Sequence, residues 1–187
     1  MTKYFILATM AIAFQVITAN GQDWTYFKGE YGIHKTITVA QGKMPDGNAL
    51  TTLTLACKGD GPKGNILLSY GVREAAKLSS FDFEYFHGPG AGALGKRLVS
   101  LTVETPRGTE RVRLKVSGSY SDMDNQADFQ FELGPPPPHF IHALMSGAQK
   151  VTIRVTDDRK KRNTIYSTFP ADGAASALKE LLKQCGK

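Results

Sequence analysis

Short runs rich in β-branched, aromatic and other apolar residues recur along most of the 187-residue chain, and clusters of Gly, Pro and Asp separate them. Runs of this length between turn residues are typical of β-strands. The predicted strands are 31–39, 50–57, 65–70, 81–86, 98–104, 110–116, 129–133, 151–156 and 164–169. Because turns join so many short strands, we expect a mainly β fold, either an antiparallel β-sandwich or an open barrel.

Two helices are expected late in the chain. After four consecutive prolines at 135–138, apolar residues recur at helical spacing at Phe140, Ile141, Leu144 and Met145. We expect the prolines to form a rigid, extended connector into this short helix. A last helix is predicted to begin near Asp172, because Asp is a favoured residue at helix N-caps.

The first 21 residues have the three parts of a secretory signal peptide. Lys3 supplies the positive charge, residues 4–17 form an apolar segment too short to span a bilayer, and small residues follow. Cleavage is expected after Ala19 or Gly21, and no lipid anchor is expected because no cysteine stands at the junction. We therefore predict a periplasmic or secreted protein without a transmembrane segment, in which residues 22–187 form a single β-rich domain.

The two cysteines, Cys57 and Cys185, each continue an apolar face. Cys57 alternates with Leu53 and Leu55 on a predicted strand, and Cys185 follows leucines at helical spacing. Because exported chains meet an oxidising compartment, we expect a Cys57–Cys185 disulfide that holds the last helix on the sheet. The alternative, a reactive thiolate or a metal ligand, needs a partner that lowers the thiol pKa, and no His lies near either cysteine in the sequence.

The net charge is mildly positive: the formal value of +6 falls to +5 once Lys3 is removed with the signal peptide. Much of this surplus comes from one run, Arg159, Lys160, Lys161 and Arg162, which is typical of a solvated loop. A nucleic-acid-binding protein more often spreads basic residues over a face and interleaves aromatic residues, so no nucleic-acid binding is expected. The four basic residues are instead candidates for contact with a protein partner.

A glycine-rich segment at 87–97 contains parts of two nucleotide-binding patterns. Gly90, Gly92 and Gly95 match G-x-G-x-x-G, but Arg97 stands where a P-loop requires Ser or Thr. A strand is expected to follow, whereas a phosphate site needs a helix N-terminus. We therefore expect no nucleotide, and interpret the segment as a surface loop that contacts a partner through His87, Gly90, Gly92, Lys96 and Arg97.

No pattern in the sequence identifies a reaction. His139 and His142 are spaced so that two imidazoles can share a metal on one helical face, but no third ligand and no H-E-x-x-H motif is identifiable. The serines of 117–121 have no His nearby in the sequence, and Asp157 and Asp158 are adjacent, so their side chains point apart. We expect no enzymatic activity and no cofactor, while metal binding by the two histidines stays open.

The last fifty residues carry a family resemblance. A short helix, an apolar strand, an F-x-x-x-G step beginning at Phe169, and Ala and Leu at helical spacing up to Cys185 follow one another. This order, the strand with Cys57, and Trp24 just after the signal peptide resemble the periplasmic accessory proteins associated with type VI secretion. The same scheme of strand, helix and disulfide occurs in the invasion-associated locus B family. The resemblance implies a bacterial periplasmic binding or accessory protein without catalysis.

Two functions are therefore expected from different classes. The first is an exported, non-enzymatic envelope or periplasmic protein that acts by contact with another protein or an envelope component, in an oligomeric state that the sequence leaves open. The alternative is a proteinaceous inhibitor of a hydrolase such as lysozyme, which would insert a loop into the enzyme cleft. Residues 117–121 are the candidate for that loop through Ser117, Ser119 and Tyr120, but a simple turn between two strands, without a function, is the favoured explanation of the same residues.

Overall fold

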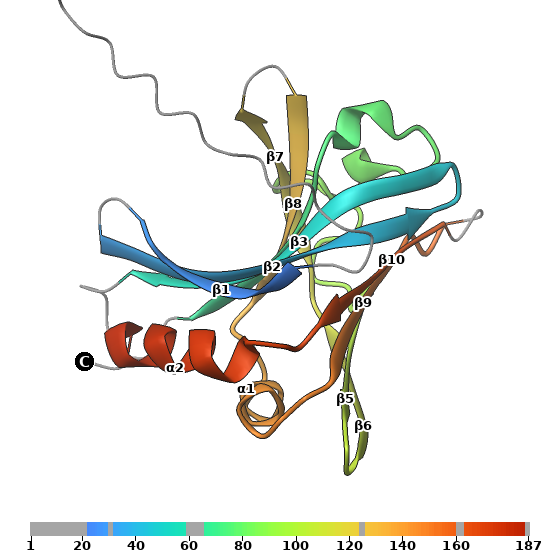
Figure 1. The fold of residues 1–187 in the computed structure, drawn as a ribbon. Coiled ribbons are helices and arrows are strands. Elements are labelled where there is room, and N and C mark those ends of the chain that lie inside the picture. Colours follow the sequence, from blue (N-terminus) through green and yellow to red (C-terminus); the bar gives the residue numbers. More distant parts are fainter. Residues whose placement is uncertain (1–21, 30–31, 59–65, 124–125, 160–162, 186–187) are drawn as a thin grey trace, which may run out of the picture.

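The ten strands in the described part of the chain belong to one antiparallel sheet (Figure 1). The computed structural model describes residues 22–29, 32–58, 66–123, 126–159 and 163–185. The strands are β1 (Gln22–Lys28), β2 (Ile33–Met44), β3 (Gly47–Lys58), β4 (Leu67–Val72), β5 (Val99–Thr105), β6 (Gly108–Leu114), β7 (Ser117–Met123), β8 (Gln126–Gly134), β9 (Lys150–Thr156) and β10 (Thr164–Pro170). Their order in the sheet is β6-β5-β9-β10-β2-β3-β4-β8-β7, with β1 paired to β2 beside β10.

The prediction of a mainly β, antiparallel fold is confirmed, and the sheet has the form of an open half-barrel. Figure 1 shows the sheet curling, so that β5, β6 and β9 turn away from β2 and β3. Strand β2 makes this possible because its first half pairs with β1, whereas Gly42 and Lys43 near its end pair with β10. One long strand therefore joins the two arms of the curled sheet.

The inner face of the sheet carries the hydrophobic core. Buried and partly exposed residues alternate along β2, β5, β9 and β10, as expected for strands with one face covered. The cross-strand registers place Leu53 of β3 opposite Tyr70 of β4, and Tyr70 opposite Phe131 of β8, all three without solvent exposure. The alternation of the sequence thus becomes one continuous apolar surface inside the curl.

Two helices cover part of this inner face. Helix α1 (Pro138–Met145) begins at the last of the four prolines, and Pro137 before it has the polyproline-II angles φ −58° and ψ 139° expected of a rigid connector. Helix α2 (Ala174–Cys185) packs on α1 and on strands β1, β2 and β3, with Leu178 and Leu181 fully buried (Figure 1). No described helix is long and apolar enough to span a membrane.

The predicted disulfide is confirmed. Cys57 at the end of β3 and Cys185 at the end of α2 are bonded, with their Cα atoms 6.0 Å apart. Trp24 of β1 ties the start of the same helix, because its backbone N–H donates to Asp172 O at 3.1 Å and its Nε1 donates to Pro170 O at 3.0 Å. The C-terminal helix is therefore fixed at both of its ends.

Three parts of the chain differ from the strands predicted by sequence pattern. The run at 81–86, predicted as a strand, forms a 3-10 helix at Phe83–Phe86, in which Asp82 accepts a hydrogen bond from the Tyr85 backbone N–H at 3.1 Å. A second 3-10 helix, Ala75–Lys77, precedes it. Phe81, Phe83 and Phe86 are buried against Phe129 and Phe131 of β8, so aromatic packing rather than strand pairing decides this segment. The other two parts that differ are strands β1 and β7, which the sequence pattern did not predict.

Candidate functional site

The outer face of β6, β5, β9 and β10 carries a row of alternating cations and hydroxyl groups. The cross-strand registers align Arg113, Ser100, Arg154 and Tyr166, and Tyr166 is in turn opposite Lys43 of β2. Neighbouring strands are about 4.8 Å apart, so Arg113 and Arg154 are about 10 Å apart across the small residue Ser100. Each cation in the row is therefore separated from the next by one strand that carries a hydroxyl group.

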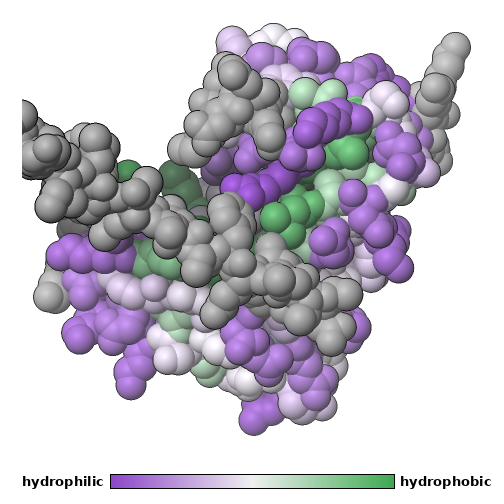
Figure 2. All heavy atoms as spheres, turned by 45° about the horizontal axis from the view of Figure 1, so that its top comes forward, coloured by the Kyte–Doolittle hydropathy of each residue, from purple (hydrophilic) through white to green (hydrophobic). Residues whose placement is uncertain are grey.

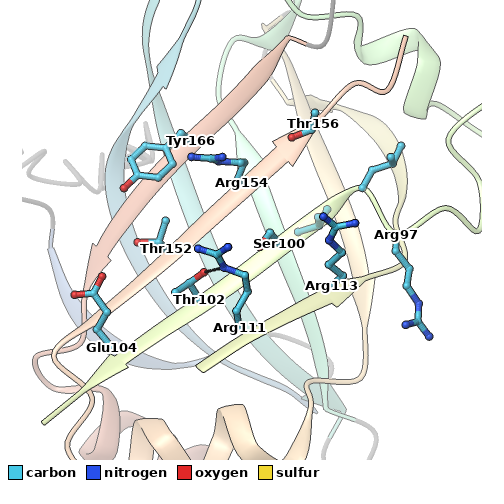
Figure 3. A pocket seen from close by; sticks show the side chains of 12 residues that line it. Arg97, Ser100, Thr102, Glu104, Arg111, Arg113, Thr152, Arg154, Thr156 and Tyr166 are labelled. Atoms are coloured by element: carbon cyan, nitrogen blue, oxygen red, sulfur yellow. Dashed lines mark hydrogen bonds between the residues drawn. The ribbon is translucent and has the colours of Figure 1, made fainter. Parts of the chain in front are cut away.

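A second row lies beside the first and forms the floor of a shallow pocket. Arg111, Thr102 and Thr152 are opposite one another on β6, β5 and β9, and Arg111 Nε donates to Thr102 Oγ1 at 3.4 Å. The two rows line a cavity of about 430 Å³. Figure 3 shows Arg111, Arg113 and Arg154 around Ser100 and Thr102, with Glu104 at one end of the pocket and Arg97 at the other. We call this surface, with its arginines Arg97, Arg111, Arg113 and Arg154, the arginine face.

The arginine face is not neutralised by its own carboxylates. Within the described residues, no Asp or Glu forms an ion pair with any of its four arginines, and all four side chains are exposed. Glu104, the acidic residue that lines the pocket, is engaged by Lys150 at 2.9 Å. The face therefore presents four uncompensated positive charges on a rigid sheet.

Tyr166 is held by hydrogen bonds on its strand neighbours and lies close to two of the cations. Hydrogen bonds with Thr168 and Thr152 and the nearby charges of Lys150 and Arg154 lower the pKa of Tyr166. The Arg154 guanidinium carbon also lies 5.7 Å from the centre of the Tyr166 ring, in cation–π contact. Because Arg presents a planar fork of N–H donors, the face is suited to carboxylates or other planar anions.

Two of the basic residues predicted to contact a partner, Lys96 and Arg159, form ion pairs that join parts of the fold. Arg159 pairs with Asp157 at 2.7 Å and Asp82 at 2.5 Å, and Lys96 pairs with Asp158 at 3.0 Å. These contacts hold the long connection between β4 and β5 against the end of β9. The hydrogen bond from Arg159 keeps the pKa of Asp157 below its usual value.

Tyr85 lies at the centre of this ionic junction. Its hydroxyl donates to Asp158, it accepts a hydrogen bond from Lys96, and the Arg159 guanidinium carbon lies 4.6 Å from its ring centre. The hydrogen bond from Tyr85, with help from Lys96, lowers the pKa of Asp158. A hollow of about 750 Å³ lies over the junction, but the charged side chains that line it are already paired with one another.

Two predicted contact segments meet in space. His87 forms a β-bridge with Gly118, and its ring centre lies 5.1 Å from that of Tyr120. The segment that includes Ser117, Ser119 and Tyr120 is strand β7 rather than the predicted loop, because it pairs with β8 along its whole length. Burial and the nearby Glu84 raise the pKa of Tyr120 to about 12, and its ring packs edge-on against Phe129.

The glycine-rich segment packs on the body of the protein. Gly92 lies so close to the Tyr85 ring that an added Cβ would be 2.5 Å from Cε2, whereas Gly90 has open space around it. Ala93, next to Gly92, is fully buried, and its backbone N–H donates to Tyr85 O at 3.0 Å. As expected, strand β5 follows at Val99, and Arg97 is the residue of the segment that joins the arginine face.

The remaining predicted residues fall at separate places. His139 and His142 are both exposed on α1, and no cluster of three potential metal ligands occurs among the residues that the structure describes. Lys160, Lys161 and Arg162 lie outside the described residues, as does the predicted signal peptide at 1–21. Figure 2 shows that, on the coloured part of one face, polar residues surround a group of apolar residues.

Sequence reasoning missed Arg111, Arg113 and Arg154. The pattern did contain a signal, because these arginines alternate with Val112, Leu114 and other apolar residues, which places them on the outer face of their strands. The pattern did not give the order of the strands, so it could not predict that the arginines lie close together.

Comparisons with known protein families, with curated proteins and with solved structures found no match for this chain.

Proposed function

We propose that this is an exported, non-enzymatic binding protein of the bacterial envelope, and that its arginine face docks an acidic surface of a partner protein. The observation that carries the proposal is the set of four exposed arginines without ion-pair partners among the described residues. Lys96, Lys150 and Arg159 are each paired with a carboxylate, whereas the four arginines that gather on this face have no such partner among the described residues.

The arrangement favours an extended acidic surface over a single small anion. The row from Arg113 through Arg154 to Lys43 crosses five strands, which corresponds to about 19 Å at 4.8 Å per strand spacing. One phosphate or carboxylate cannot reach both ends of such a row. A protein surface with several Asp and Glu residues can, and complementary charges of this kind increase the association rate and select the partner.

The compartment of this function is part of the proposal. The Cys57–Cys185 disulfide is of the kind that persists outside the cytoplasm, and the signal-like N-terminal sequence agrees with export. The resemblance of the C-terminal third to periplasmic accessory proteins of type VI secretion supports an accessory role by protein contact.

The test uses poly-L-glutamate as the acidic probe and poly-L-lysine as the polymer control. We expect the purified exported protein to bind poly-L-glutamate and not poly-L-lysine, with affinity that falls as salt is raised. Arg113→Glu and Arg154→Glu should each weaken binding at least tenfold. Lys179→Glu makes the same change in charge at an exposed site on α2 and should leave the affinity within about twofold. Equal loss in all three variants would mean that net charge alone, and not the arginine face, attracts the probe.

A cross-linking experiment tests the same proposal in the cell envelope. A photo-cross-linking residue in place of Thr102, within the pocket, should capture an acidic partner protein that the same residue in place of Lys179 does not capture. Identical products from both positions would refute the assignment of the arginine face as the docking surface.

A further inference from the structure

Strand β6 is an open edge of the sheet beside the arginine face. It pairs with β5 on one side, and it stands at the end of the strand order. On its other side, no described strand or helix pairs with it. The opposite edge differs, because the backbone N–H of Gly88 donates to Gly118 O at 3.0 Å and His87 bridges to β7 there. An unpaired row of backbone N–H and C=O groups is therefore available at β6 and partly covered at β7.

The two sides of β6 carry different side chains. Thr109, Arg111 and Arg113 are exposed on the outer face, where the last two belong to the arginine face. On the inner face, Leu114 is buried and Val112 is half-buried against the core, while Glu110 nearer the start of the strand is exposed. A strand added to β6 would place its alternate side chains beside arginines on one face and beside Val112 on the other.

The charge on this edge selects against a second copy of the same chain. If β6 paired with its own copy, Arg111 and Arg113 would meet the same two arginines across the new strand pair, and like charges in cross-strand positions are destabilising. Charged edge residues are a common protection against pairing between identical proteins. The same residues attract a strand of opposite charge, since an element that repels one partner can favour another.

We propose that the partner supplies an extended segment in which acidic residues alternate with apolar ones, and that this segment adds to β6 as an eleventh strand of the sheet. This inference rests on the proposed function and specifies how the arginine face is engaged. Main-chain hydrogen bonds to β6 hold the segment, carboxylates pair with Arg111 and Arg113, and apolar side chains extend the inner face beside Val112.

If the partner segment adds to β6, reversing the charge of an arginine on β6 should weaken its binding more than reversing the charge of an arginine on a more distant strand. An added strand lies about 4.8 Å beyond β6, so its outward carboxylates are next to Arg111 and Arg113. Arg154, on β9, is three strand spacings away, or about 14 Å, which exceeds the Debye length of about 8 Å at physiological ionic strength. Arg113→Glu should therefore weaken binding of such a segment at least tenfold, and Arg154→Glu no more than about threefold.

The experiment uses a seven-residue peptide, with blocked ends, in which glutamate alternates with valine. Its controls are a peptide of the same composition with all glutamates at one end, and two peptides in which alternate backbone nitrogens, of either parity, are methylated. All of these carry the same charge. We expect the alternating peptide to bind the full exported protein and to slow amide exchange in Gly108–Leu114, and one of the two methylated peptides to lose at least tenfold in affinity, because methylation removes the N–H donors that face β6.

The possible results separate this inference from the proposed function. If both methylated peptides and the segregated peptide bind as tightly as the alternating one, and Arg154→Glu weakens binding as much as Arg113→Glu, strand addition is refuted while the acidic docking surface stands. If the alternating peptide and poly-L-glutamate both fail to bind, the proposed function fails with it. Protection of β7 amides instead of β6 amides would also overturn the inference, because it would place the added strand at the wrong edge.

Discussion

Replacing both cysteines with alanine should destabilise the protein by about 2–5 kcal/mol. The bridge joins residues 128 positions apart, and the chain-entropy relation gives about 5 kcal/mol for a loop of this length, which is an upper value because denatured chains retain structure. Alanine leaves no hydroxyl group without a partner at two positions that are less than a tenth exposed. A loss of about 3 kcal/mol in a domain of this size lowers Tm by about 6–12 °C.

The structure also predicts where the loss is felt first. Helix α2 has 12 residues, which is marginal for an isolated helix, and it stays folded through the docking of Leu178, Leu181 and the disulfide. Without the bridge, its C-terminal end is held by side-chain packing alone. Hydrogen exchange should therefore accelerate most in Ala174–Cys185 of the double variant, with β9 and β10 much less affected.

Two measurements make the test decisive. Chemical denaturation of the oxidised wild type, the reduced wild type and the Cys57→Ala/Cys185→Ala variant gives the free energy of unfolding, and the last two should agree within about 1 kcal/mol. Leu178→Ala in the oxidised protein serves as a packing control and should cost about 2–5 kcal/mol while the bridge is intact. A double variant as stable as the oxidised protein, or equal exchange in α2 with and without the bridge, would refute the reasoning.

Four further predictions concern other parts of the chain. Gly92→Ala should destabilise the protein because its Cβ meets the Tyr85 ring, whereas Gly90→Ala should be nearly neutral in the same thermal melt. The pKa of Asp157 is lower in the folded state than the usual 3.8, so its contribution to stability should be present above that pH and be lost as the pH falls below it; Asp157→Asn should flatten this acid dependence. Millimolar ATP with magnesium should leave Tm unchanged, and a rise of several degrees would reveal a nucleotide site. N-terminal sequencing of the exported form should begin within a few residues of Asn20, and an intact Met1 would overturn the predicted export.

The periodicity of the sequence predicted most of the local elements and the face on which each cysteine lies. Alternation in the run ending at Cys57, and helical spacing in the run ending at Cys185, predicted both elements and the face on which each thiol lies. These features depend on the backbone geometry of neighbouring residues, which the order of amino acids determines directly. Eight of the nine predicted runs fall within or overlap observed strands for the same reason.

Where local preference and packing disagreed, the sequence pattern was a poor guide. The run at 81–86 has the composition of a strand, but Phe83 and Phe86 are buried against β8 as part of a 3-10 helix. Strand β7 is rich in Ser and Gly and has little intrinsic strand preference, yet pairing with β8 makes it a strand. In both cases, contacts with a distant part of the chain outweigh the preference of the segment itself.

The arginine face could be decided only by the tertiary structure. The sequence by itself determines that Arg113 and Arg154 lie on the outer faces of their strands, because side chains alternate with a period of two. It does not determine that β5 separates these two strands, or that β10 and β2 extend the row to Lys43. Strand order is set by the packing of the whole core, since pairing between distant strands depends on how all of their apolar faces are buried together. The charges of the site therefore come from the sequence, whereas their spacing comes from the fold.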